Sequence, residues 1–278
     1  MNFYKLCKKP FFGRFMVEWV NPLSEEEKKE WQQIEVQSKS GGLIAGLFAL
    51  AKTENAKATI VLGHPMGKEA KGYFIKNGYT NLLRAHGYNV LLFDINGFGE
   101  SAHGNFSYFD DIIAIGMEAK KLTPDLPIGY HGISLGGIWA TIAFADESHN
   151  YDFAIVESAA TTLDEFWVHF PVAHKTLKIL NVFFPSYRKK IRMIDRIKEV
   201  KKLQSILFIY SLTDDWTTVS MGERLHLNCN VQSELWTIEK AKHAMIMKSE
   251  FKEVYQEKII AYFDQSINEL IEKKSIAK

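Results

Sequence analysis

The sequence predicts an α/β fold in which a mostly parallel sheet is covered by helices on both faces. Three observations support this prediction. Apolar runs of strand length alternate with segments of helical spacing along most of the chain, which is the pattern of a parallel sheet. A chain of 278 residues is long enough to bury a large core. No repeat or linker interrupts it, so we expect one domain over residues 1–278 with a single insertion.

The strands follow from local patterns, taken in chain order. Two apolar runs flank Ser40-Gly41-Gly42 and predict a β-hairpin over residues 32–38 and 43–50. Six further strands, for a total of eight, are expected at 57–63, 88–94, 126–134, 151–158, 204–211 and 233–239. Helical spacing and stop signals at Gly87 and Thr123-Pro124 predict the intervening helices. These helices are expected at 73–87, 110–122, 135–146 and 249–273.

Residues 160–200 break the alternation because they contain no expected strand. They are rich in aromatic residues and prolines, and we interpret them as an inserted lid of short helices. Four aromatic side chains are candidates for an apolar acyl pocket. These are Phe166, Trp167, Phe170 and Phe183. The alternative is that these rings only fasten the lid to the body of the protein.

The charge balance excludes one class of partner. The chain has 34 basic and 33 acidic side chains, a net charge of +1, so nothing indicates a nucleic-acid partner. Cys7 and Cys229 are too few and too far apart for a disulfide framework, which predicts a reducing, cytoplasmic compartment. We expect no signal peptide, and the most apolar stretch, GGLIAGLFALA, is too short to span a membrane.

The first twenty residues mix lysine and arginine with phenylalanine, tyrosine and tryptophan. This composition allows two interpretations. The segment can contact a membrane surface, or it can fold back onto the domain. We favour the second interpretation.

The loop in VLGHPMGKEA, residues 61–70, has two possible roles. A phosphate-binding loop needs four residues between its glycines and a hydroxyl residue after its lysine. Here Gly63 and Gly67 are separated by three residues, and Glu69 follows Lys68. The later GFGESA also lacks the third glycine of a dinucleotide-binding loop. Phosphate binding is therefore disfavoured, and a loop that binds an oxyanion is the remaining interpretation.

The stretch Gly132-Ile133-Ser134-Leu135-Gly136 matches G-x-S-x-G between an expected strand and an expected helix. This pattern predicts a nucleophile elbow, a sharp turn that exposes the serine hydroxyl above the sheet. A serine nucleophile needs a base, and His243 lies in the right place after the last strand. The acid is expected after the preceding strand, where Asp214 and Asp215 are both candidates, with Glu157 a weaker one.

An elbow of this kind needs two backbone N–H groups that stabilise the oxyanion. One is expected from Leu135, the residue after the nucleophile. The other is expected from the early loop GHPMG. Pro65 has no N–H group, so Met66 is the candidate donor. His64 is interpreted as a structural residue that braces the loop.

Together these motifs resemble the α/β-hydrolase superfamily, and within it the serine aminopeptidase-like and BEM46-like hydrolases. The segments GISLGG, GHPMG, DINGFGESAHG, LFIYSLTDDWTTV and LWTIEKAKHAM are similar to the family's motifs, over residues 32–266. The resemblance implies hydrolysis of an ester, thioester or amide without a cofactor or metal. The residue spacing of the family's acid motif favours Asp214 as the acid. Three positions depart from the family pattern: Pro65, Ser211 and Lys242 each replace a glycine.

The predicted function is hydrolysis of a small carboxylic ester with a short or medium acyl group. Ser134 attacks the carbonyl, His243 moves the proton and Asp214 orients His243. Three alternatives remain: a thioesterase or serine peptidase that uses the same residues, a non-hydrolytic enzyme on the same fold, and a member that only binds a ligand.

Overall fold

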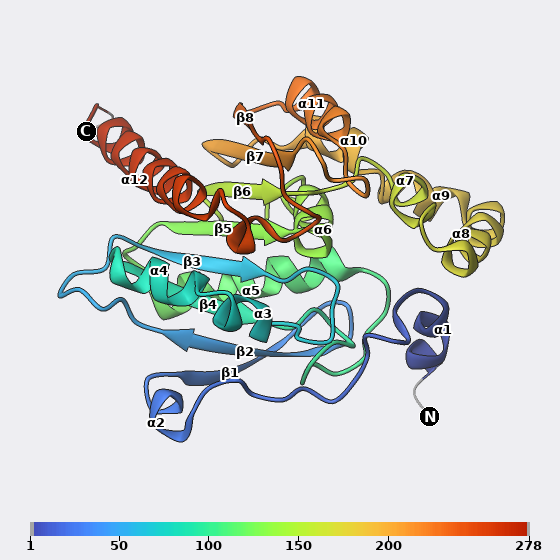
Figure 1. Ribbon diagram of the computed structural model, residues 1–278, viewed down its shortest axis with the longest axis horizontal. Helices are drawn as coiled ribbons and strands as arrows, with labels where there is room; N and C mark the ends of the chain where they lie inside the picture. The colour runs from blue at the N-terminus through green and yellow to red at the C-terminus, as the bar shows by residue number, and fades with distance from the viewer. Residues whose placement is uncertain (1–2, 277–278) are drawn as a thin grey trace.

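A computed structural model describes residues 3–276, and an eight-stranded sheet forms its centre (Figure 1). The strand order is β1-β2-β4-β3-β5-β6-β7-β8. Strands β1 and β2 form an antiparallel hairpin, β2 also pairs antiparallel with β4, and all other neighbours are parallel. The strands are β1 (Gln32–Gln37), β2 (Leu43–Ala49), β3 (Ala58–Gly63), β4 (Tyr88–Phe93), β5 (Ile128–Ile133), β6 (Phe153–Glu157), β7 (Ser205–Ser211) and β8 (Gln232–Ile238). The predicted mostly parallel sheet is confirmed.

The apolar runs in the sequence form the central strands, whose two faces are both covered by helices. Every residue of β3, β4, β5, β6 and β7 is buried. The edge strands β1 and β8 are only partly buried, and their sequences are correspondingly more polar. Parallel strands with helices on both sides have no solvated face, so their sequences are continuously apolar.

Helices from different parts of the chain cover the two faces of the sheet (Figure 1). One face carries α3 (Gly72–Lys76), α4 (Tyr79–Ala85) and α12 (Lys252–Ile276). The other carries α5 (Tyr108–Leu122), α6 (Leu135–Ala143), α10 (Met193–Arg196) and α11 (Val219–Asn228). The remaining helices are α1 (Phe3–Phe12), α2 (Glu25–Lys28), α7 (Leu163–Trp167), α8 (Pro171–Phe183), α9 (Pro185–Lys190) and the short 3-10 turns η1 (Ile197–Glu199) and η2 (Ile246–Lys248).

The expected helix over residues 73–87 is wrong in one respect, because it is two helices. Gly78 adopts φ 79° between α3 and α4. A left-handed residue ends the first helix, and glycine adopts this conformation without the cost that a side chain would add. The expected stop at Gly87 is confirmed, since α4 ends at Ala85 and Gly87 adopts φ 89°.

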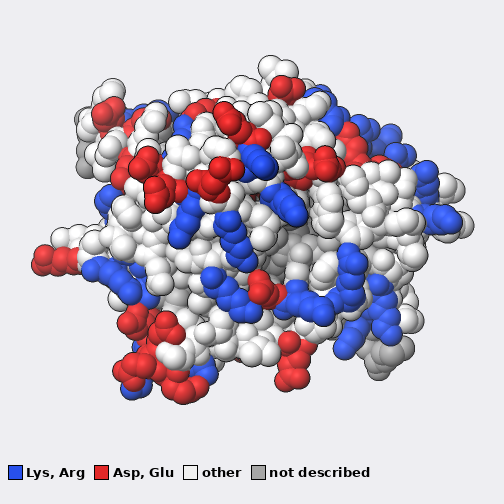
Figure 2. Space-filling view, viewed as in Figure 1, with Lys and Arg blue, Asp and Glu red and all other residues white. Residues whose placement is uncertain are grey.

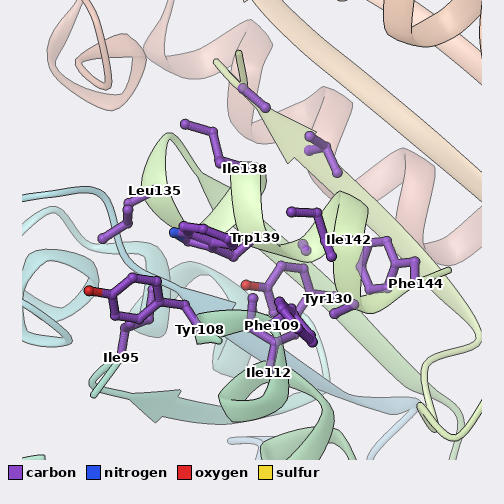
Figure 3. Close-up of a cluster of buried hydrophobic side chains, with 14 of the residues drawn as sticks. Ile95, Tyr108, Phe109, Ile112, Tyr130, Leu135, Ile138, Trp139, Ile142 and Phe144 are labelled. Carbon is purple, nitrogen blue, oxygen red and sulfur yellow. The ribbon is translucent and has the colours of Figure 1, made fainter. Parts of the chain in front are cut away.

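A cluster of aromatic and aliphatic side chains fixes α6 against α5 (Figure 3). The rings of Tyr108 and Trp139 lie 5.0 Å apart between the two helices. Ile138 and Ile142 are buried on the same helix. Large rings with complementary packing hold a helix rigidly, so the first residue of α6 has a defined position at the carboxyl end of β5.

The insertion after β6 consists of α7, α8, α9 and α10, as predicted for a helical lid. The N-terminal helix α1 packs on it, since the rings of Phe11 and Phe12 lie 5.3 and 5.4 Å from the ring of Trp167. Residues 1–2 and 277–278 of the expected domain lie outside the described residues. Within residues 3–276, no helix has both the length and the apolar character that crossing a membrane requires.

Candidate active site

Ser134 lies at the turn between β5 and α6, in a conformation that is unfavourable for a residue with a side chain. Its backbone has φ 50° and ψ −109°. Such a conformation costs on the order of 1–3 kcal/mol and persists only where the surroundings impose it. Here the Ser134 N–H donates to the carbonyl of Glu157 at 2.9 Å, and the Ile138 N–H donates to the carbonyl of Ser134 at 2.7 Å. The strained turn is thus fixed from the neighbouring strand and from its own helix.

The elbow also requires glycine two residues on either side of the serine. A Cβ atom on Gly136 would lie 2.1 Å from the carbonyl oxygen of Gly63. One on Gly132 would lie 2.8 Å from the carbonyl carbon of Gly136. Backbone atoms cannot move away from either contact, so the spacing in the sequence reflects close packing of β3, β5 and α6.

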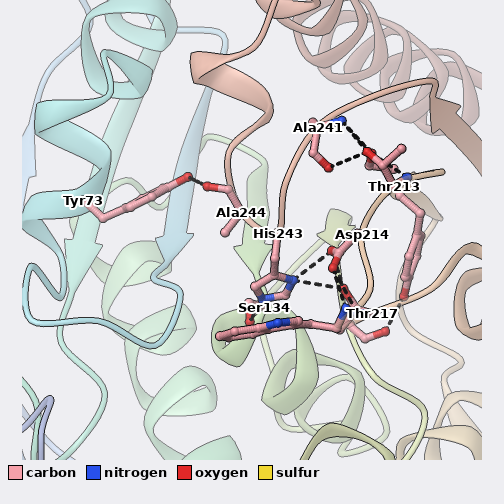
Figure 4. A network of polar contacts seen from close by, with 12 residues as sticks. Tyr73, Ser134, Thr213, Asp214, Thr217, Ala241, His243 and Ala244 are labelled. Atoms are coloured by element: carbon pink, nitrogen blue, oxygen red, sulfur yellow. Dashed lines mark hydrogen bonds and ion pairs between the residues drawn. The ribbon is translucent and has the colours of Figure 1, made fainter. Parts of the chain in front are cut away.

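The structure brings Ser134, His243 and Asp214 into one chain of hydrogen bonds (Figure 4). Nε2 of His243 lies 2.7 Å from Oγ of Ser134, and Nδ1 lies 2.8 Å from Oδ2 of Asp214. The three residues come from loops after β5, β7 and β8, which all end at the same edge of the parallel sheet. When Nδ1–H donates to the carboxylate, Nε2 is free to accept the serine proton.

Asp214 occupies this position in preference to the other two candidates. Its side chain is buried, whereas Asp215 is exposed. Glu157 is buried elsewhere, where it accepts a hydrogen bond from Tyr255 and lies 3.2 Å from His131. Burial alone would raise the pKa of Asp214, but hydrogen bonds and attraction from His243 outweigh it. With further help from Thr217, they hold that pKa below its usual value.

Sequence reasoning missed Thr217, which supports Asp214 directly. Its hydroxyl donates to Oδ2 of Asp214 at 2.7 Å, and its backbone N–H donates to Oδ1 at 3.1 Å. The N–H of Trp216 also donates to Oδ1, at 2.9 Å. The indole of Trp216 stacks on His243 with ring centres 5.2 Å apart. The available signal was the Asp-x-x-Thr spacing, which is typical of a turn closed by an aspartate side chain.

The loop that carries His243 is tied down by groups on both sides. The Ala241 N–H donates to the hydroxyl of Ser211 at 2.8 Å and also reaches Thr213 at 3.1 Å. On the other side, the hydroxyl of Tyr73 donates to the carbonyl of Ala244 at 2.7 Å (Figure 4). Ser211, one of the departures from the family pattern, therefore joins the acid loop to the histidine loop.

The loop after β3 lies beside the elbow, and His64 braces it as predicted. Nε2 of His64 accepts a hydrogen bond from the Ile95 N–H at 3.0 Å, while its carbonyl accepts from the Gly136 N–H at 3.1 Å. Burial lowers the pKa of His64, which favours this neutral form. Met66 lies two residues after His64, and Leu135 directly precedes Gly136. Leu135 is the first residue of α6, where a backbone N–H has no intrahelical acceptor.

A cavity of about 740 Å³ opens above Ser134 and is lined by Pro65, Met66, Phe166, Trp216 and His243 among others. Of the four expected pocket aromatics, only Phe166 lines it. Trp167 packs against α1, and Phe170 packs edge-to-face against Trp216 with ring centres 5.3 Å apart. The expectation for Phe183 is wrong, because its side chain is 72% exposed on the surface of α8.

Three lysines line the mouth of this cavity: Lys68, Lys240 and Lys242. All three are exposed, and none has a side-chain ion pair or hydrogen bond to another residue in the described part of the chain. Glu69 at the same mouth is paired with Lys76 at 3.0 Å. Asp215 also lines the cavity and is exposed, so the mouth carries charges of both signs.

Solved structures of the same fold place the chain in a known class. The Pyrococcus furiosus esterase Pf2001 superposes with a TM-score of 0.70 at 18% identity, over 88% of this chain and 97% of that one. Est1E from Butyrivibrio proteoclasticus superposes with a TM-score of 0.61 at 15% identity, over 85% and 99%. With the sheet order and the elbow, these likenesses define the chain as a protein of the α/β-hydrolase fold.

Within this class, the chain belongs to the serine aminopeptidase S33 family, whose model matches residues 54–247. The uncharacterized protein YqkD of Bacillus subtilis (strain 168) is 29% identical over 186 residues. That match covers 60% of this chain, and it spans 59% of the length of YqkD.

Proposed function

We propose that the protein hydrolyses a carboxylic ester with a short or medium acyl group, through an acyl-enzyme on Ser134. One observation carries the proposal. Ser134, His243 and Asp214 form an unbroken hydrogen-bonded chain whose serine faces a cavity. A serine that donates to an imidazole, itself oriented by a carboxylate, is the arrangement of a nucleophile with its base.

In the proposed reaction, Oγ of Ser134 attacks the substrate carbonyl carbon as Nε2 of His243 takes its proton. The imidazolium then gives this proton to the leaving alkoxide, and the alcohol departs. Water attacks the acyl-enzyme with His243 again as the base, which releases the acid and restores the serine. Asp214 stays ionised throughout and stabilises the imidazolium.

The backbone N–H groups of Met66 and Leu135 are the proposed oxyanion donors. Leu135 follows the nucleophile, and the loop that holds Met66 is braced against the elbow by His64. Backbone N–H donors stabilise an oxyanion more strongly when they are fixed in place before the negative charge develops on the substrate oxygen. The rigid contact between the two loops supports this role.

The size of the cavity supports a small substrate. A volume of about 740 Å³ lies within the ordinary range for small-molecule sites. Each buried methylene contributes about 0.8 kcal/mol of binding. A four-carbon extension of the acyl chain is therefore expected to raise kcat/KM on the order of a hundredfold until the pocket is full. We also propose a cytoplasmic location, since Cys7 and Cys229 are both free thiols.

The test is a series of p-nitrophenyl esters from two to sixteen acyl carbons, compared by kcat/KM. We expect a rise followed by a maximum at short or medium chains. A flat series, or a maximum at the longest chain, would contradict the small pocket. Membership of the serine aminopeptidase family favours a peptidase as the second candidate, so aminoacyl arylamides belong in the same assay. Preference for an arylamide over every ester would replace the first proposal with the second.

A further inference from the structure

Helix α8 of the lid is apolar on two opposite sides. Ala173 and Leu177 are buried against the rest of the protein. The opposite side exposes residues at the spacing of a single helical stripe, continued by the residue after the helix. These exposed side chains are Val172 (69%), Ile179 (59%), Val182 (76%), Phe183 (72%) and Phe184 (59%). An exposed apolar surface of this extent indicates an interaction site.

Helix α1 lies beside α8 and extends this surface (Figure 1). Its inner residues Phe11 and Phe12 are buried against Trp167. Its outer residues Phe3 and Leu6 are 71% and 47% exposed. Two segments that are far apart in the sequence therefore present apolar side chains at the same end of the molecule. We call the exposed apolar residues of α1 and α8, together with Phe184, the lid face.

Basic residues predominate around the lid face, where Arg188 pairs with Asp164 at 3.4 Å and Arg192 with Asp195 at 3.1 Å. Residues 3–17 and 168–192 contain ten lysines and arginines and no aspartate or glutamate, although the whole chain is nearly balanced. They are Lys5, Lys8, Lys9, Arg14, Lys175, Lys178, Arg188, Lys189, Lys190 and Arg192. All except Lys8 are exposed. In Figure 2, blue and white atoms gather at the lower right of the view, where Figure 1 places α1.

We propose that the lid face binds the surface of an anionic lipid bilayer, with α8 in the plane of the interface. The apolar stripe would enter the boundary between headgroups and acyl chains, as amphipathic interfacial helices do. Lysine and arginine would extend their apolar stems along it and place their charges among the anionic headgroups. The combination of exposed apolar residues with an excess of unpaired positive charge supports this occupant.

A second copy of the chain fits the lid face less well. A symmetric dimer places the same surface on both sides of the interface. Arg188 and Arg192 have carboxylate partners, but the other seven exposed cations form no ion pair within the described residues. In a dimer these would face one another, and like charges across an interface oppose association. A bilayer that contains acidic lipids supplies the missing negative charge. The lid face shares no residue with the hydrogen-bonded chain of Ser134, so the proposal stands apart from the proposed hydrolysis.

The experiment is co-sedimentation of the full chain with vesicles of phosphatidylcholine, and with vesicles in which about a third of the lipid is phosphatidylserine. We expect binding to the anionic vesicles, and weakening as the salt concentration rises. Each basic residue at such a surface contributes about fivefold (about 1 kcal/mol) to the partition coefficient. The double variant Lys175→Gln/Lys178→Gln should therefore bind about thirtyfold more weakly. Val182→Ser/Phe183→Ser should lose at least tenfold through its apolar contact.

Matched controls change exposed residues elsewhere. Leu227→Ser removes an apolar side chain that is 80% exposed on α11, and Lys248→Gln/Lys252→Gln removes two exposed lysines. Both should bind as the unchanged protein does, and all variants should keep its thermal midpoint. Equal binding by lid-face and control variants would overturn the proposal. So would an absence of binding to anionic vesicles, or a dimer that dissociates when Phe183 becomes serine.

Discussion

Replacing Asp214 by asparagine tests whether this carboxylate sets the protonation of His243. Oδ1 of Asp214 accepts the backbone N–H groups of Trp216 and Thr217, at 2.9 and 3.1 Å. An asparagine must therefore keep its oxygen at this position. Its NH₂ group then takes the place of Oδ2, which lies 2.8 Å from Nδ1 of His243.

An NH₂ group at that position donates to Nδ1, so the imidazole must carry its proton on Nε2 instead. Nε2–H then faces the hydroxyl of Ser134, 2.7 Å away, and cannot accept its proton. The loss expected for this wrong tautomer is about 10⁴ in kcat, or about 5.5 kcal/mol of transition-state stabilisation. Because the side chains have nearly the same shape, KM should change little.

The assay is steady-state hydrolysis of the best p-nitrophenyl ester, with the thermal midpoint measured for each variant. Asp215→Asn is the matched control, since Asp215 is exposed and makes no contact with His243 in the described chain. It should stay within about twofold of the unchanged protein. A folded Asp214→Asn variant that keeps a tenth of the activity would refute the reasoning, as would a larger loss for Asp215→Asn.

Three further predictions concern the support of the site and the fold. Thr217→Val removes a hydroxyl that donates to Asp214 at 2.7 Å. Because hydrogen bonds to charged groups contribute about 1.5–3 kcal/mol, kcat should fall about tenfold at unchanged KM. An unchanged kcat would show that the hydroxyl is dispensable. Gly136→Ala should lower the thermal midpoint by several degrees or prevent folding, because its methyl group would meet the Gly63 carbonyl; a normal midpoint would contradict the packing argument. Burial lowers the pKa of Lys8 from 10.5 to about 7, although Asp111 attracts its charge. The unfolded chain then holds more protons above pH 7, so the free energy of unfolding should rise by about 2 kcal/mol between pH 7 and 9. Denaturant titrations should find this rise in the unchanged protein and not in Lys8→Met. If the free energy of unfolding depends on pH equally in both proteins, the ammonium group of Lys8 is in contact with water.

The sequence predicted the sheet well because burial on both faces leaves a simple signal. The sequences of strands β3 to β7 are continuous apolar runs. The glycines of the elbow were also predictable, because the close packing there leaves no room for a Cβ atom. The break at Gly78 was missed, since one glycine within a helical pattern does not by itself reveal its φ angle. The structure was needed to choose between Asp214 and Asp215, because it shows that Asp214 is buried and Asp215 is exposed.

Residues that act through tertiary contacts could not be predicted in the same way. Ser211 and Ala241 are 30 positions apart, and their hydrogen bond depends on two loops meeting at the end of the sheet. The sequence of the lid did not show which side of α8 is buried, because this helix is apolar on both sides. Spacing alone could not decide that Leu177 faces the core while Phe183 faces outward.

The most direct measurement of the central claim is labelling with a fluorophosphonate, which reacts with a serine activated by a neighbouring base. The unchanged protein should be labelled, and peptide mass analysis should place the adduct on Ser134. Ser134→Ala should show no labelling at an unchanged thermal midpoint. Undiminished labelling of Ser134→Ala, or no labelling of the folded unchanged protein, would contradict the assignment of Ser134 as the nucleophile.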